Sequence, residues 1–456
     1  MKLPATLPLL VASTMFMEQL DGTILVTALP EIARSFGGTA AQLDLSVSAY
    51  LVTLSFMIPA SGWIADRLGA KRVYGCAIVL FILASILCAA SQTVWQFVGA
   101  RILQGLGGAM MVPVGRLIVL RQTEKKDLIR AIAYLTWPAL SAPLLGPPLG
   151  GFITAYFSWH WIFYINVPLG LVALFFVWKI VPGSQFVERR KFDAAGFFLT
   201  GTAILSLLFS IEMLGRAGIP IVAAVALFGL GLACGAMAIR RGLKISAPLI
   251  SLEAFRTLTF RLAMRGGGVF RGCLATLPFL LPLLFQVGFG LDPVTSGTLV
   301  LAIFAGNLGM KPATTWVLRH FRFKRIMLVS GCIALATMLG CALLTAQTPH
   351  VVIVALLVVS GLARSMQFTS LSTLAFSDVP KPAMGGANTL FSMQQQAANA
   401  CGVAIAGALL RLAPFSHGGV QTVADFQFTF VVIAVLAAIA MTDFYKVPQN
   451  AGEALR

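Results

Sequence analysis

The stretch QLDGTILVTALP, from Gln19 to Pro30, places a carboxylic acid, Asp21, inside the first long apolar segment of the chain. A second acid, Glu18, lies just before it at helical spacing. A charged side chain at the centre of a membrane span costs about 2.5–3.5 kcal/mol, so such residues are paired, protonated or functional. A carboxyl group that loads and releases a proton at this depth would indicate ion-coupled transport.

The composition around this stretch is that of a polytopic membrane protein. Hydrophobic residues form 58% of the 456 residues, charged residues form 11%, and the mean hydropathy is +0.89. The net charge of +17 lies in short basic runs between apolar segments, as in cytoplasmic membrane loops, so we expect no nucleic-acid binding. The 7 cysteines and 4 histidines have no disulfide or metal-ligand spacing. We therefore predict no metal site and no cofactor.

Fourteen apolar stretches have the roughly 20 residues that a transmembrane helix needs. They run over residues 7–29, 44–65, 73–92, 95–120, 130–156, 160–181, 194–214, 219–239, 262–288, 295–318, 326–346, 351–373, 387–412 and 427–445. Five clusters of Lys and Arg occupy alternate loops, whereas the opposite loops and span ends hold only Arg34, Arg216 and Arg411. Because Lys and Arg prefer the cytoplasmic side, both termini are predicted to be cytoplasmic.

Two longer polar loops, residues 183–193 and 240–261, bracket the seventh and eighth spans and leave six spans on each side. We predict an all-α membrane protein with an N-terminal six-helix bundle over residues 1–182 and a C-terminal six-helix bundle over residues 262–456. Residues 183–261 would form a linker with two additional transmembrane helices.

The loop after the second span reads GWIADRLGAKR, from Gly62 to Arg72. Gly62 would let two helices approach closely, and Gly69 would allow the turn. The basic residues fit a cytoplasmic anchor, but an anchor does not explain Asp66. Asp66 is expected to meet an arginine or the N-terminus of a helix.

Two further segments place unusual residues inside spans. RILQGLGGA, from Arg101 to Ala109, carries Arg101 and Gln104 in the fourth span, and the acids of the first span are the expected partners of the arginine. GPPLGG, from Gly146 to Gly151, sets prolines beside glycines that allow close helix packing. This segment is expected to act as a hinge or a seal, or as a purely structural kink.

Together these segments resemble the major facilitator superfamily, and within it the fourteen-span drug:proton antiporter branch that includes EmrB- and QacA-like proteins. The segments LDGTILVTALP, GWIADRLGAKR, RILQGLGGA, GPPLGG and SWHWIFYINVPLG, the last from Ser158 to Gly170, follow in the order of that branch's motifs. GGAMMVPVGRL, from Gly107 to Leu117, is similar to the MdtD-type subgroup. The resemblance covers the whole chain.

The resemblance implies two pseudo-symmetric six-helix bundles that rock about a central cavity, with export driven by the proton gradient. It implies that Asp21 carries the proton, with Glu18 as the other candidate and Arg101 as modulator. It assigns gating to Gly62, Asp66, Gly69 and Arg72, and to Gly146, Pro147, Gly150 and Gly151. The expected setting is the bacterial cytoplasmic (inner) membrane, where a monomer exchanges protons for a small-molecule substrate across the lipid bilayer.

The second half carries cations where the first half carries acids. Arg265 and Arg271 lie in the ninth span, Lys311 in the tenth and Arg364 in the twelfth, and these three spans contain no acid. Cations facing a watery cavity favour an anionic ligand, such as a carboxylate metabolite or an iron-carboxylate chelate of citrate. These four residues and Gln104 are the predicted substrate-binding residues; alternatively, Arg271 and Arg364 bond to backbone carbonyls.

Other functions remain open at this point. Broad multidrug efflux of lipophilic compounds is the first alternative, and import or uniport of a metabolite is the second, because a fold does not fix the direction of transport. A non-transporting scaffold would have little reason to keep buried charges. An enzyme is not expected, since no loop offers a catalytic triad, a phosphate-binding loop or a metal cluster.

Overall fold

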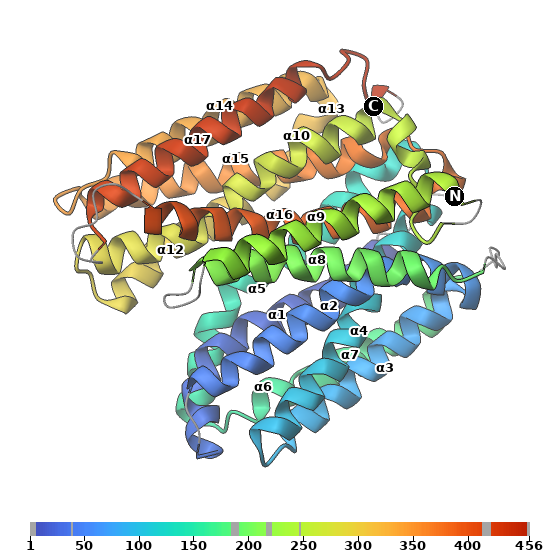
Figure 1. Cartoon of the computed structure of the whole chain (residues 1–456), viewed down its shortest axis with the longest axis horizontal. Helices are drawn as coiled ribbons and strands as arrows, with labels where there is room; N and C mark the ends of the chain where they lie inside the picture. The colour runs from blue at the N-terminus through green and yellow to red at the C-terminus, as the bar shows by residue number, and fades with distance from the viewer. Residues whose placement is uncertain are drawn as a thin grey trace. The chain divides into compact units, whose positions relative to one another are not determined.

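The computed structural model describes residues 6–37, 40–183, 191–215, 221–245, 248–412 and 421–453 (Figure 1). Over these ranges all regular secondary structure is helical. The predicted all-α class is confirmed.

The chain forms two compact units. Unit 1 comprises Met1–Gly201, Ala238–Leu252 and Lys381–Ser392, and unit 2 comprises Thr202–Met237, Glu253–Pro380 and Met393–Arg456. The predicted division at residues 182 and 262 stays a prediction.

The helices that lie wholly in unit 1 are α1 (Thr6–Ser35), α2 (Ala40–Leu68), α3 (Ala70–Ala89), α4 (Val94–Gln122), α5 (Leu128–Tyr156), α6 (Trp161–Tyr164) and α7 (Asn166–Ile180). Those in unit 2 are α10 (Leu258–Ala275), α11 (Leu277–Leu283), the π-helix Leu284–Gly288, α12 (Pro293–Gly309), α13 (Lys311–His320), α14 (Phe323–Ala342), α15 (His350–Ser377) and α17 (Val423–Tyr445). Three helices have residues in both units: α8 (Ala194–Gly215), α9 (Ile221–Lys244) and α16 (Met384–Leu412).

Each of the fourteen predicted stretches falls on one helix or on consecutive helices. Within the described residues, 10 helices are long and apolar enough to span a membrane, and two bent helix pairs raise that number to 12. The remaining two stretches lie on α8, where Ala194–Ser210 is apolar but shorter, and on α16, which includes the polar run Gln394 to Gln396.

Proline explains where both bent spans break. The two halves of α1, Thr6–Leu25 and Thr27–Ser35, meet at 63°. Pro30 has no N–H for the Val26 carbonyl, and its ring clashes with that carbonyl, so the bend falls at Val26. In unit 2, α12 and α13 meet at 45° around Met310, next to Pro312. The second break places Lys311 at the start of α13.

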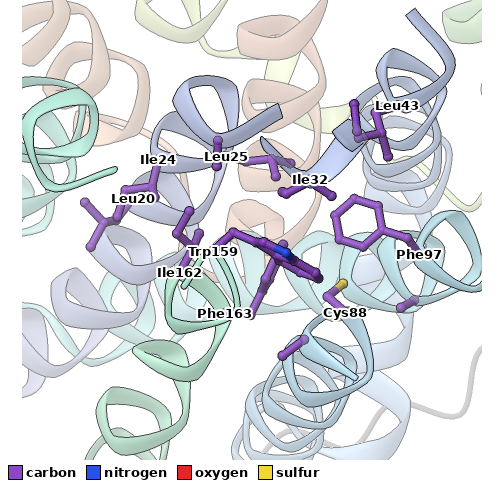
Figure 2. Close-up of a cluster of buried hydrophobic side chains, with 14 of the residues drawn as sticks. Leu20, Ile24, Leu25, Ile32, Leu43, Cys88, Phe97, Trp159, Ile162 and Phe163 are labelled. Carbon is purple, nitrogen blue, oxygen red and sulfur yellow. The ribbon is translucent and has the colours of Figure 1, made fainter. Parts of the chain in front are cut away.

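The core of unit 1 contains an apolar cluster contributed mainly by α1, α3, α4 and α6 (Figure 2). Phe97 of α4 packs against Phe163 with ring centroids 5.6 Å apart and against Trp159 at 6.4 Å. All three rings are at most 4% exposed. The cluster is relevant to the site because several of its residues lie on α1, the helix that carries Glu18 and Asp21.

The segment that leads into α8 is held by Asp193. Its carboxylate accepts hydrogen bonds from Gly196 N at 2.9 Å and from Arg241 Nε at 2.8 Å. Burial alone would raise the pKa of Asp193, but these hydrogen bonds and the charge of Arg241 outweigh burial and lower it. The start of α8 is therefore tied to the end of α9 by a charged contact.

Candidate functional site: buried acids and buried cations

Asp21 lies in unit 1 at the centre of a hydrogen-bonded network that joins α1, α3, α4 and α7. Arg101 Nη1 forms an ion pair with Asp21 Oδ2 at 2.6 Å, and both side chains are at most 1% exposed. Asp21 Oδ1 accepts hydrogen bonds from Gln104 Nε2 and from Asn166 Nδ2, each at 2.8 Å. The carboxylate is thus neutralised and hydrogen-bonded on both oxygens.

The partners of Asp21 also hold one another. Ser85 Oγ of α3 accepts from Gln104 Nε2 at 2.9 Å and from Asn166 Nδ2 at 3.3 Å. Arg101 Nη1 also donates to Gln104 Oε1, which fixes the amide between the two charges. A network in which every member bonds to the next is rigid, because moving one group leaves several buried groups unsatisfied.

The apolar cluster of Figure 2 covers this network on one side. Phe97 precedes Arg101 on α4 by about one turn, and Phe163 precedes Asn166 at the α6–α7 junction in the same way. Cys88 belongs to the cluster, and its Sγ lies 3.7 Å from Gln104 Oε1. Apolar side chains next to the network lower the local dielectric constant, which strengthens the ion pair.

Glu18 occupies a different environment, although it is only 8% exposed. Tyr50 Oη donates to Oε1 at 3.2 Å, and Gln19 Nε2 donates to Oε2 at 3.3 Å. Arg116 of α4 attracts the carboxylate electrostatically, but no cation of the described residues lies within ion-pair distance of Glu18. The Tyr50 ring also contacts Arg101, whose Cζ lies 4.2 Å from the ring centroid. Tyr50 therefore touches both the Glu18 carboxylate and the Asp21–Arg101 pair.

Asp66 meets an arginine, the first of its two expected partners. Arg121 Nη2 donates to Asp66 Oδ1 at 2.7 Å, at the ends of α4 and α2. Gly62 packs against the first turns of α16, because a Cβ at Gly62 would lie 2.6 Å from Thr389 Oγ1. Gly69 has a φ of 88°, a region that favours glycine, and forms the turn into α3. Arg72 is exposed and lies apart from the Asp66–Arg121 pair.

The segment GPPLGG lines the contact between α5 and α1. A Cβ at Gly146 would collide with Thr23, and a Cβ at Gly150 would lie 3.0 Å from the Ile24 carbonyl and closer still to Thr27. Gly151 has no atom within 4 Å of its Cβ position, and Pro147 is exposed. Two of the four predicted positions therefore set the close approach of α5 to α1.

This difference predicts opposite results for adjacent glycines. Gly150→Ala is expected to force α1 and α5 apart and to cost about 1–3 kcal/mol of stability, as overpacking does. Gly151→Ala adds the same methyl group to the same helix without a neighbour to displace, so its thermal stability should be unchanged or higher. Thermal unfolding of the purified proteins in detergent measures both. Equal destabilisation of both variants would contradict the close-packing role of Gly150.

Two of the predicted cations lie against the Phe368 ring of α15 in unit 2, and a third contacts the adjacent residue, Thr369. Arg271 of α10 lies with Cζ 4.1 Å from the Phe368 ring centroid, and Arg364 of α15 lies at 5.1 Å. Lys311 at the helix break donates to Thr369 Oγ1 at 2.8 Å and is 6% exposed. Arg364 Nε and Nη1 are buried and have no hydrogen-bond partner among the described residues. We call Arg271, Lys311, Arg364 and Phe368 the cation cluster.

The other two predicted substrate-binding residues lie elsewhere. Arg265 pairs with Asp443 of α17, with Nε donating to Oδ2 at 2.6 Å and Nη2 bonding to Oδ1. Gln104 belongs to the Asp21 network of unit 1. Sequence reasoning did not find Tyr50, Ser85 or Phe368. Asn166 stood inside the quoted segment SWHWIFYINVPLG, as a lone amide in an apolar span, but had no predicted role.

Comparisons with known proteins place the chain in a family. Residues 11–403 match the model of the Major Facilitator Superfamily. The chain is 36% identical over 451 residues to the "Putative multidrug resistance protein MdtD" of Salmonella typhimurium, which covers 97% of this chain and 94% of that protein. The Salmonella heidelberg protein of the same name matches to the same extent.

Two solved structures share the fold at low sequence identity. The human organic anion transporter MFSD10 (TETRAN) has a TM-score of 0.70 at 14% identity and covers 97% of this chain and 99% of its own. The proton:xylose symporter XylE, bound to 6-bromo-6-deoxy-D-glucose, has a TM-score of 0.64 at 15% identity and covers 98% and 96%. With a family match over most of its length and an all-helical, multi-pass architecture, the chain belongs to the major facilitator superfamily of membrane transporters.

Proposed function

We propose that the chain is a proton-coupled antiporter that exports an organic anion by alternating access, with a carboxylate metabolite such as citrate, or its iron chelate, as the substrate class. It would work in the bacterial cytoplasmic membrane with both termini in the cytoplasm. The cation cluster would bind the anion, and the acids of α1, Glu18 and Asp21, would couple transport to protons with Arg101.

One observation carries the substrate class: the buried nitrogens of Arg364 that have no hydrogen-bond partner among the described residues. An unsatisfied N–H of a charged group inside a protein costs more than 1–3 kcal/mol, so such a group is usually satisfied by a ligand. Arg271 of α10 contacts the Phe368 ring, and Lys311 of α13 contacts the hydroxyl of the next residue, Thr369. Two other helices thus bring cations to the same part of α15. A carboxylate accepts charge-assisted hydrogen bonds from guanidinium groups in a fork geometry, which fits this donor set.

The α1 acids support the coupling part of the proposal. Both carboxylates are buried in the first span, where an acid that never changes its protonation state would be costly to keep. Their surroundings differ, because Asp21 is paired with Arg101 and Glu18 is held by neutral donors. Two acids in unlike environments can take different roles, one as a proton carrier and the other as a fixed charge.

The test of the substrate class is equilibrium binding of citrate to the purified full-length protein. Arg364→Gln removes the charge and most donors of the orphaned guanidinium, and we expect affinity to fall roughly 10- to 100-fold, the effect of losing a charged hydrogen bond. Lys179→Gln, which removes one exposed charge at the end of α7 in unit 1, is the matched control and should bind citrate as the native protein does. Unchanged citrate affinity in Arg364→Gln would remove Arg364 from the site.

Multidrug efflux is the second candidate, because the two curated relatives carry the name of a multidrug resistance protein. A pocket for lipophilic cations would ordinarily place acids and aromatic rings together, whereas the cation cluster combines one ring with three positive groups. Uptake of citrate and of tetraphenylphosphonium into proteoliposomes under the same pH gradient separates the two. Proton-driven movement of tetraphenylphosphonium alone would favour the second candidate.

A further inference from the structure

Unit 2 contains a groove that the transport site does not use. α12 packs closely against α15: a Cβ at Gly306 would collide with the Val358 carbonyl, and one at Gly361 would collide with the Ile303 carbonyl. Beyond the break at Met310 the chain turns by 45° into α13, and this close packing ends. A cavity of about 420 Å³ lies between α13, α14 and α15. The break that positions Lys311 therefore also opens the groove.

The groove has an apolar wall that continues onto exposed apolar surface. Its lining is almost entirely aliphatic and aromatic: Met310, Val317, Phe321, Arg325, Ile326, Val329, Ser330, Ile333, Val359, Leu362, Ala363 and Met366. Val329 is 52% exposed and Val359 is 42% exposed, as expected for side chains that face acyl chains in a membrane protein.

The groove and the members of the cation cluster on α15, Arg364 and Phe368, lie on opposite faces of that helix. At 100° per residue, Val359, Leu362, Ala363 and Met366 share one face of the helix, and Arg364 and Phe368 point the other way. The body of α15 therefore separates the groove from Arg364 and Phe368. A molecule in the groove would not occupy the anion site.

One end of the groove is strongly basic. Arg325 lines this end and is exposed, and its Cζ lies 6.0 Å from the centroid of the Phe321 ring. Among the described residues it has no hydrogen-bond or ion-pair partner. Its basic neighbours already have partners: Arg322 donates to Gln449 Oε1 at 2.8 Å, and Lys324 lies 4.5 Å from the Tyr445 ring. The sequence contains no acid from Pro293 to Ser377. The positive charge at this end therefore favours an anionic group, and the apolar lining favours an apolar tail attached to it.

Aromatic residues mark the same end as the membrane interface. Trp316 in the second half of α13 is 57% exposed, and Tyr445 at the end of α17 is 69% exposed. Trp and Tyr concentrate where the hydrocarbon core meets the headgroups, which would place Arg325 at the depth of lipid phosphates. Basic pockets between transmembrane helices on the cytoplasmic side bind acidic phospholipid headgroups.

We propose that this groove is a binding site for an anionic phospholipid, with the phosphodiester on Arg325 and one acyl chain along Val329, Ile333 and Val359. The bound lipid would fill the space left by the α12–α13 break and support the bent span that carries Lys311. The site is independent of which substrate the protein transports.

The experiment measures lipid retention by native mass spectrometry of the full-length protein in mild detergent, titrated with palmitoyl-oleoyl phosphatidylglycerol or with the phosphatidylcholine of the same chains. We expect one phosphatidylglycerol to bind, at least fivefold more tightly than phosphatidylcholine, since one basic contact contributes about 1 kcal/mol. Equal retention of the two lipids would overturn the headgroup assignment and with it the proposal.

Matched variants locate the site. Arg325→Gln should weaken phosphatidylglycerol binding about fivefold, whereas Arg319→Gln, which removes an exposed charge in the last turn of α13 outside the groove, should not. Val329→Trp should block the groove, whereas Val435→Trp places the same ring on an equally exposed position of α17, at 54%, and should not. Equal loss in Arg325→Gln and Arg319→Gln would indicate diffuse attraction and contradict the site, as would full binding in Val329→Trp.

Discussion

Glu18→Gln is expected to abolish proton-driven transport while leaving substrate binding and thermal stability close to those of the native protein. Glutamine has nearly the same shape and still accepts a hydrogen bond from Tyr50, but it cannot release a proton. Because no cation is paired with Glu18 among the described residues, removing its charge leaves no buried positive group behind. This variant therefore tests coupling without the loss of stability that a broken ion pair would cause.

The surroundings of Glu18 support it over Asp21 as the proposed proton carrier. It is attracted by Arg116 and repelled by Asp21, and its direct contacts come from the neutral groups of Tyr50 and Gln19. Hydrogen bonds from neutral donors favour the carboxylate less strongly than a bound guanidinium does. Glu18 can therefore gain and lose a proton without dismantling its surroundings.

The measurement uses proteoliposomes with an imposed pH gradient, in which substrate uptake and internal pH are followed together. The substrate is citrate or tetraphenylphosphonium, whichever the native protein moves. Glu124→Gln is the control, because Glu124 is an exposed acid outside the spans that pairs with Lys126 at 2.8 Å. Proton flux at the native rate in Glu18→Gln would exclude Glu18 as the carrier and return the role to Asp21.

The residues that the sequence made visible were those that are anomalous in an apolar span. Asp21, Arg101 and Arg364 each carry a charge where charge is costly, so their importance follows from position alone. Asn166 and Ser85 escaped notice because uncharged polar residues are common in membrane helices and cost far less to bury. Only the packing of α3 and α7 around Asp21 shows that these two complete its hydrogen bonds.

Arg265 and Arg271 show a second limit of reading the sequence. Both are arginines of the same span, six residues apart, and nothing local separates their roles. At 100° per residue they face different sides of α10, and their partners come from distant parts of the chain: Asp443 for Arg265 and Phe368 for Arg271. Long-range packing, which the local pattern does not contain, decides which of the two joins the cation cluster.

Asp21→Asn is expected to lower the free energy of unfolding by about 3–5 kcal/mol, because it leaves the wholly buried Arg101 without a counter-charge. The asparagine would also present an NH2 group where Gln104 and Asn166 already donate. Thermal unfolding in detergent should show this loss directly, and low yield from membranes would accompany it.

The double variant Asp21→Asn/Arg101→Gln separates a structural role of the pair from a role in proton transfer. Removing both charges eliminates the uncompensated cation, so we expect the double variant to recover most of the stability lost in Asp21→Asn. The coupling energy between the two sites should be well above the error of a double-mutant cycle. If the stable double variant still takes up substrate against a pH gradient, Asp21 positions α1, α4 and α7 and Glu18 carries the proton. If it folds but no longer couples, the proton passes through Asp21 itself. Native stability in the single variant Asp21→Asn would contradict both interpretations. It would mean that buried Arg101 does not need Asp21 as its counter-charge.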